Sequence, residues 1–236
     1  MSAETSNSAW KPLYRIGGIA PLITAALYLT QLLLIIVSGV AYPTTPESWF
    51  ALFQRSTFLG LIFLNALDVF SIAILGLMFL ALFVALRQNN PSLMLVAAFF
   101  VFLGIAVFVS ARAEMVTATI SLSHQYAAAT TEAQRSQLQA AGQAILSITR
   151  ATPETIGFLF IAFGSLIISF VMRHSDAFGR GVAYIGILGF VLTVANDLSI
   201  VTNSSVAAIL LPINGLIWLI WWLLISLKLL RIGRST

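Results

Sequence analysis

The sequence predicts an all-α, polytopic membrane protein with six transmembrane helices. Of its 236 residues, 59% are hydrophobic and only 8% are charged, and the mean hydropathy is +0.99. A soluble globular domain carries about 25% charged residues, so this composition belongs to a chain that is solvated mainly by lipid. Six apolar segments are long enough to cross a hydrocarbon core of about 30 Å.

The first of these segments covers residues 16–42 and follows Lys11 and Arg15. The preceding residues are polar and Ser-rich, without the apolar region and cleavage site of a signal peptide, so residues 1–15 are expected to form a cytoplasmic tail. Thr24, Tyr28, Gln31 and Ser38 recur at helical spacing. They are therefore predicted to share one face that points into the bundle.

The run Tyr14-Arg15-Ile16-Gly17-Gly18-Ile19-Ala20, followed by six apolar segments, resembles a family of uncharacterised bacterial six-helix integral membrane proteins known only as a domain of unknown function. The resemblance extends over nearly the whole chain. It implies the six-helix fold and a bacterial inner membrane, and it implies no activity.

The remaining spans are predicted at residues 57–86, 92–123, 153–172, 181–201 and 206–227. Two further helices are expected between spans on the outer side. Over residues 45–55, Thr45 is a candidate cap with Pro46 in the first position, and Trp49, Phe50 and Phe53 would lie on one side, as in a helix resting at the headgroups.

The second outer helix is predicted over residues 131–150. Thr131 and Gln134 fit a capping box, and Leu138, Ala141 and Ile145 begin an apolar stripe. Two interpretations remain open. The helix lies on the bilayer or packs on the loops, or it forms a lid over the outer polar residues.

The basic residues orient the bundle. Eight basic residues lie near the two termini or in the two loops on the same side of the membrane as the termini. Only three, Arg55, Arg135 and Arg150, lie in the loops on the opposite side, although those loops are longer. The positive-inside rule therefore predicts a multi-pass protein of the cell membrane with both termini cytoplasmic. The domain would comprise residues 16–231, with a second tail at residues 232–236.

Polar residues occur at similar heights in several spans, about 21 to 31 Å from their cytoplasmic ends at about 1.5 Å per residue. We expect them to form an outward-facing, mildly acidic layer, either as a binding site or as a structural network. Its members are Asn65, Asp68, Arg112, Glu114, Glu154, Asn196, Asp197 and Asn214.

Arg112 and Glu114 are the centre of this predicted layer. Residues two apart in a helix face different neighbours, so each is expected to find a partner on another helix. For Arg112 the sequence leaves two candidates, Asp68 and Asp197, because a guanidinium binds carboxylates bidentately.

Several chemistries are not expected. The chain has no cysteine, and its two histidines, His124 and His174, fall on opposite sides of the predicted membrane, so neither a cofactor nor a metal is predicted. The basic residues are scattered, which argues against nucleic acid. No pattern matches a catalytic constellation, and an enzyme acting on a lipid headgroup is the weakest hypothesis.

Two functions therefore remain from the sequence. The first is a membrane protein, with the bilayer as its surroundings, that binds, senses or transports a small or cationic ligand on the outer side. The second is a noncatalytic accessory or scaffold protein whose outer polar network is structural. The sequence indicates no particular oligomeric state.

Overall fold

The computed structural model describes residues 9–149, 153–202 and 206–234, and this part of the chain contains helices and no strands. The helices are α2 (Lys11–Ser38), α3 (Pro46–Arg55), α4 (Thr57–Phe63), α5 (Leu67–Leu86), α6 (Pro91–Ala128), α7 (Glu132–Thr149), α8 (Pro153–Met172), α9 (Arg180–Val201) and α10 (Ala207–Arg234). In the described part, six helices are long and apolar enough to cross a membrane, namely α2, α5, α6, α8, α9 and α10. The predicted six-span, all-α fold class is confirmed.

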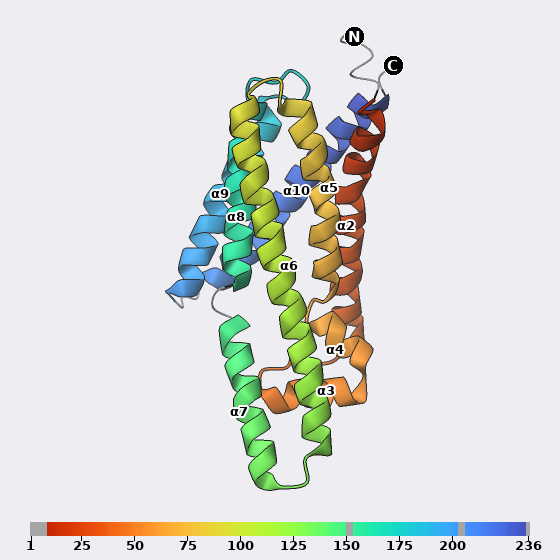
Figure 1. The fold of residues 1–236 in the computed structure, drawn as a ribbon, viewed down its shortest axis with the longest axis vertical. Helices are drawn as coiled ribbons and strands as arrows, with labels where there is room; N and C mark the ends of the chain where they lie inside the picture. Colours follow the sequence, from red (N-terminus) through yellow and green to blue (C-terminus); the bar gives the residue numbers. More distant parts are fainter. Residues whose placement is uncertain (1–8, 150–152, 203–205, 235–236) are drawn as a thin grey trace.

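The six long helices form a closed ring in the order α2, α5, α6, α8, α9, α10, and α10 packs back on α2 (Figure 1). The side chains of Leu82, Met172 and Trp221 are completely buried in the apolar core of this ring. Large apolar side chains on the outside of the ring, such as Leu33 and Phe99, are exposed. Lipid would cover them in a membrane, as expected for spans that face hydrocarbon.

Glycines permit the closest helix contacts. A Cβ atom on Gly104 of α6 would lie 2.6 Å from the backbone oxygen of Gly157 in α8, and one on Gly17 would lie 2.9 Å from the backbone oxygen of Leu77 in α5. Small residues allow membrane helices to approach and gain van der Waals contact. Gly17 and its neighbour Gly18 are therefore helix-packing positions, against α5 and α10 respectively.

The second span is not the continuous helix over residues 57–86 that the sequence predicts. It is divided into α4 and α5 by residues 64–66, where Asn65 has a φ of 55°. This left-handed conformation is unusual for a residue with a side chain, and asparagine tolerates it better than most. The segment is apolar on both sides of Asn65 and Asp68, so its hydropathy gave no signal of the break.

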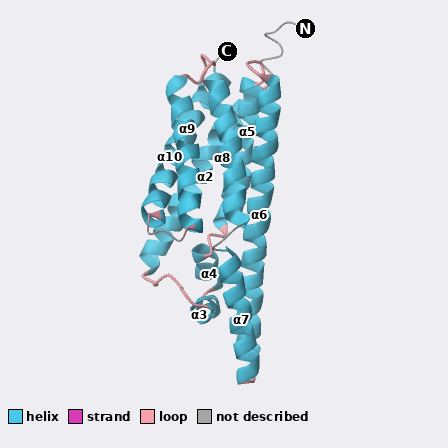
Figure 2. Ribbon diagram, turned by 90° about the vertical axis from the view of Figure 1, so that its left-hand side faces the viewer, coloured by secondary structure: helices cyan, strands magenta, loops and turns pink. Residues whose placement is uncertain are grey.

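The fold extends beyond the ring at the end away from the termini (Figure 2). Here α6 continues to Ala128, five residues past its predicted end, and α3, α4 and α7 pack around it. Trp49, Phe53 and Phe63 are buried in a second apolar core in this outer region.

Both outer helices pack on protein. Thr45 and Ser48 form a capping box at the start of α3, which confirms the predicted cap. The side chains of Trp49, Phe50 and Phe53 lie on one side of α3, as predicted, and are 2%, 1% and 4% exposed, so this side faces protein. They are covered because α3 lies against α4, α6 and α7.

The helix α7 begins with the predicted capping bond. In this bond the backbone N–H of Gln134 donates to Oγ1 of Thr131 over 3.2 Å. It runs beside the outer part of α6 and contacts α3, where Gly142 lies close to Pro46 and Phe50 (Figure 1). Of the two interpretations, packing on the outer elements agrees with the structure, because α7 lies alongside α6 and not across the ends of the ring.

Replacing Gly104 by Ala is expected to destabilise the protein by about 1–3 kcal/mol, since the added carbon meets backbone that cannot move aside. Thermal unfolding of the purified protein in detergent measures the effect. Gly215→Ala in α10 is the matched control, because nothing lies within 4 Å of its Cβ position and alanine favours a helix. Equal unfolding temperatures for the two variants would contradict the proposed α6–α8 contact.

Candidate functional site

Six of the eight predicted polar residues divide into two groups of contacting residues on different helices. The Arg112 cluster consists of Gln31, Leu64, Asn65, Asp68 and Arg112, on α2, α5, α6 and the turn between α4 and α5. The Asp197 cluster consists of Thr193, Asn196, Asp197, Asn214 and Trp218, on α9 and α10.

Arg112 is buried, with 9% of its side chain exposed. Its Nη2 atom lies 3.9 Å from Oδ2 of Asp68, and its Nη1 atom donates a 3.1 Å hydrogen bond to the backbone oxygen of Leu64. The guanidinium carbon is 5.5 Å from the centre of the Phe108 ring, one turn earlier in α6. Of the two carboxylates proposed for Arg112, the structure therefore pairs it with Asp68.

The break in the second span creates the acceptor that Arg112 uses. In a continuous helix the Leu64 oxygen would accept from the amide of Asp68, but that amide donates to Asn65 at 3.0 Å instead. The Leu64 oxygen is thereby left at the negative end of α4. A buried guanidinium is well suited to satisfy it, because guanidinium groups donate several hydrogen bonds at once.

Asp68 occupies the first turn of α5, where the positive end of the helix dipole favours a carboxylate. Gln31 of α2 donates to Oδ1 of Asn65 at 2.9 Å and to Oδ1 of Asp68 at 3.4 Å. The amide of Gln31 thus joins α2 to both sides of the break. These contacts make the Arg112 cluster a connection between α2, α4, α5 and α6.

The Asp197 cluster is centred on the hydroxyl of Thr193. The indole nitrogen of Trp218 donates to it over 2.9 Å, the side-chain amide of Asn214 donates over 3.2 Å, and the hydroxyl donates to the backbone oxygen of Gly189 over 2.9 Å. Thr193 and Asn214 are both buried, so these bonds satisfy polar atoms inside the α9–α10 contact.

Two oxygen atoms one turn further along α9 have no such donor. The side-chain amide of Asn196 donates to Oδ1 of Asp197 at 3.4 Å. Oδ1 of Asn196 and Oδ2 of Asp197 are buried atoms that receive no hydrogen bond from any residue the structure describes. Asn196 itself is 4% exposed, whereas Asp197 is half-buried and reaches the surface. This pair of acceptors is the feature of the site most suited to a ligand.

Two of the predicted residues fall outside these clusters. Glu114 is exposed on α6 and accepts a 3.3 Å hydrogen bond from Ser110 on the same helix, so the expectation of a partner on another helix is wrong. A hydroxyl one turn away satisfies the carboxylate because nothing buries it. The side chain of Glu154 lies outside the described residues.

Sequence reasoning missed three contributors to the site. The Leu64 oxygen is a backbone atom that no side-chain pattern reports. Gln31 belonged to the inward stripe of the first span, but its spacing did not place it at the height of Asp68. Trp218 gave no signal in the sequence, because its indole contact with Thr193 depends on the packing of α9 against α10.

A family model described as a domain of unknown function, DUF4386, matches residues 16–226. The chain belongs to the DUF4386 family. Comparison with curated proteins and comparison with solved structures gave no match. The DUF4386 match spans both polar clusters and confirms the resemblance drawn from the run around Gly17 and Gly18. The match assigns no activity, and the six long apolar helices indicate a multi-pass membrane protein.

In this DUF4386 protein, Arg112→Met is expected to lower the free energy of unfolding by about 3–5 kcal/mol, because it leaves Asp68 and the Leu64 oxygen buried without the guanidinium. Thermal unfolding in detergent measures the loss. The double variant Arg112→Met/Asp68→Leu is expected to recover part of it, since the carboxylate is also removed.

The matched control is Glu114→Gln, two residues away on the same helix but exposed, which is expected to change stability by less than about 0.5 kcal/mol. If Arg112→Met and Glu114→Gln unfold at the same temperature, the Arg112 cluster does not hold the outer helices together.

Proposed function

We propose that this protein is a multi-pass protein of the cell membrane that binds a small cationic ligand at the outer side, through Asn196 and Asp197, in order to sense or transport it. The observation that carries the proposal is the pair of buried oxygens, Oδ1 of Asn196 and Oδ2 of Asp197, without a donor among the described residues. Both atoms are acceptors, so the missing partner is a donor or a cation.

The free-energy cost of leaving these two oxygens without a hydrogen bond favours a bound ligand. A buried acceptor without a hydrogen bond costs about 1–3 kcal/mol, and more when the group is charged. Thr193, one turn before Asp197 on α9, and Asn214 on the neighbouring α10 are hydrogen-bonded to each other, and Thr193 also accepts from Trp218. The unpaired oxygens therefore stand out against a neighbourhood that is otherwise satisfied.

The donor set favours a monovalent cation or an organic ammonium group. In the part of the chain that the structure describes, no three histidine, aspartate or glutamate side chains are placed to hold a metal ion. One carboxylate with one amide oxygen suits a weakly held monovalent cation or a protonated amine, whose positive charge Asp197 would balance. Asp197 is half-buried, which gives such a ligand access from the surface.

The test is thermal unfolding of the purified protein in sodium, potassium, ammonium or tetramethylammonium chloride at constant ionic strength. At least one of these cations is expected to raise the unfolding temperature, by an amount that corresponds to about 2.7 kcal/mol at a hundred times its dissociation constant. The shift should disappear in Asp197→Asn, which keeps the size of the side chain and removes its charge.

Asp176→Asn is the matched control, because Asp176 is an exposed carboxylate in the turn between α8 and α9 at the opposite end of α9. It should respond to the cations as the unchanged protein does. If no cation distinguishes the unchanged protein from Asp197→Asn, the binding proposal fails.

The alternative function is a noncatalytic accessory or scaffold protein. The Arg112 cluster favours it, since the bonds of Arg112 and Gln31 run to groups of the protein itself and join four helices. Two results together would fit this alternative. Asp197→Asn would change neither the stability of the protein nor its response to cations, and Arg112→Met would unfold it.

The proposed orientation places both termini in the cytoplasm. It can be tested directly because the chain has no cysteine. Two variants each introduce one cysteine at an exposed position. Gln137→Cys places it on α7, and Gln88→Cys places it in the turn between α5 and α6, at the opposite end of the molecule. A membrane-impermeant maleimide added to intact cells is expected to label Gln137→Cys alone, and labelling of Gln88→Cys alone would reverse the orientation.

A further inference from the structure

The two helices that carry the chain termini meet at one end of the ring. Nε of Arg15 in α2 donates a 3.0 Å hydrogen bond to the backbone oxygen of Gly233 in α10, and the hydroxyl of Ser226 donates to the backbone oxygen of Gly18 over 2.5 Å. A Cβ atom on Gly18 would lie 2.7 Å from Leu230. The contact between α2 and α10 is therefore close along its whole basic end.

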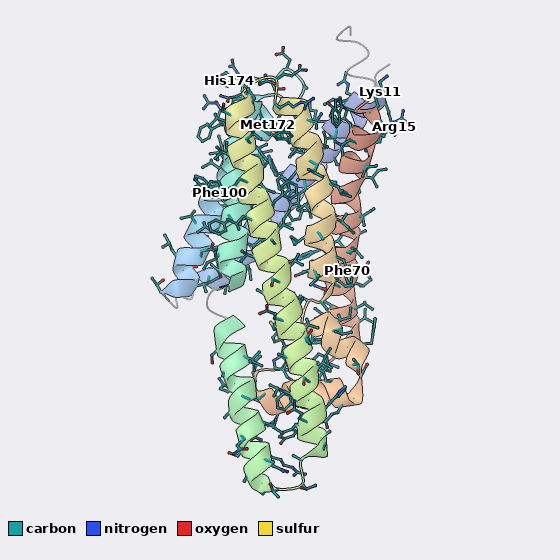
Figure 3. All side chains as sticks on the ribbon, viewed as in Figure 1. Lys11, Arg15, Phe70, Phe100, Met172 and His174 are labelled. Carbon is teal, nitrogen blue, oxygen red and sulfur yellow. The ribbon has the colours of Figure 1, made fainter. Side chains whose placement is uncertain are left out.

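Four cations lie on the two helices at this end of the contact, and we call this set of residues the basic seam. Lys11 and Arg15 are one turn apart on α2, and Arg231 and Arg234 are about one turn apart on α10. Figure 3 shows Lys11 and Arg15 together near the ends of α2 and α10. Arg231 and Arg234 directly flank positions 230 and 233, which contact α2.

No carboxylate in these helices balances the seam. Neither α2 nor α10 contains an aspartate or a glutamate, and Arg15, Arg231 and Arg234 are all exposed. The bond to Gly233 uses only Nε of Arg15, so its two amino groups take no part in that bond. Like charges one turn apart on a helix repel one another, so the seam favours an anion.

Apolar side chains follow immediately along both helices. Ile16 and Ile19 of α2 are 49% and 46% exposed, and Leu227 of α10 is 63% exposed. The cations and the apolar side chains beside them together fit a ligand with two parts. Its negative headgroup would contact the cations, and its hydrocarbon chains would lie on the apolar surface. A free anion would use only the first part.

We propose that the basic seam is a binding site for an anionic glycerophospholipid, whose phosphate contacts Lys11, Arg15, Arg231 and Arg234 and whose acyl chains lie along Ile16, Ile19 and Leu227. The lipid bridges the first and last helices and stabilises the closure of the ring. This site is independent of the cation site on α9, which lies toward the other end of the molecule.

The experiment uses the full chain in vesicles of phosphatidylcholine, with or without phosphatidylglycerol, and measures thermal unfolding and the lipid retained in native mass spectrometry. Phosphatidylglycerol is expected to raise the unfolding temperature and to stay bound. Arg231→Gln/Arg234→Gln should bind it about 30-fold more weakly, because each juxtamembrane cation contributes roughly fivefold.

The control Arg173→Gln/Arg180→Gln removes two cations from the turn between α8 and α9, at the same end of the ring. It should retain the lipid as the unchanged protein does. If both double variants lose phosphatidylglycerol equally, the proposal is overturned, because the lipid would then be attracted by the total basic charge at this end and not by the basic seam. Equal stabilisation by inorganic phosphate in phosphatidylcholine would also overturn it, since the site would then bind a free anion.

A third variant, Arg231→Lys/Arg234→Lys, separates loss of binding from loss of folding. It keeps both charges and is expected to retain the lipid within a few-fold of the unchanged protein. Loss of lipid from this variant, with the fold intact, would contradict recognition by charge.

Discussion

The guanidinium of Arg112 is bound to two helix ends at once. It donates a hydrogen bond to the Leu64 oxygen at the negative end of α4 and pairs with Asp68 in the first turn of α5. Without it, the Leu64 oxygen would lose this donor and the largely buried Asp68 carboxylate would keep the Gln31 amide but lose its counterion, which is costly in a membrane protein. The division of the second span and the position of α6 therefore depend on one another.

The break has a consequence for the outer region. Because α4 ends just before α5 begins, the chain between α2 and α5 can turn, and α3 lies against α4 and α6. Trp49, Phe53 and Phe63 then form an apolar core outside the ring, with α7 as its cover. The molecule is thus a six-helix ring joined to a small packed outer layer, and the Arg112 cluster lies at their junction.

The ring has two chemically different ends. At one end α2 and α10, neither of which contains a carboxylate, bring cations together. At the other end α9 presents two buried acceptor oxygens that receive no hydrogen bond from the described residues. The first suits an anionic lipid and the second a cationic ligand. The middle of the ring is filled by Leu82, Trp221 and other fully buried side chains, so the two ends are separated by a packed apolar core.

The sequence by itself determined the membrane class, the six spans and both outer helices, because hydropathy, capping residues and prolines act through local chemistry. It also narrowed the partner of Arg112 to two aspartates, since a charge in an apolar span requires a counterion. The tertiary structure decided that Asp68 is this partner, that Asn65 interrupts the second span, and that Glu114 faces outward. Those outcomes depend on which helices are neighbours and how they are rotated, and this follows from side-chain packing between segments distant in the sequence. The buried oxygens of Asn196 and Asp197, which have no donor among the described residues, also depend on the tertiary structure, because a contact can be found missing only once the helices around it have been placed.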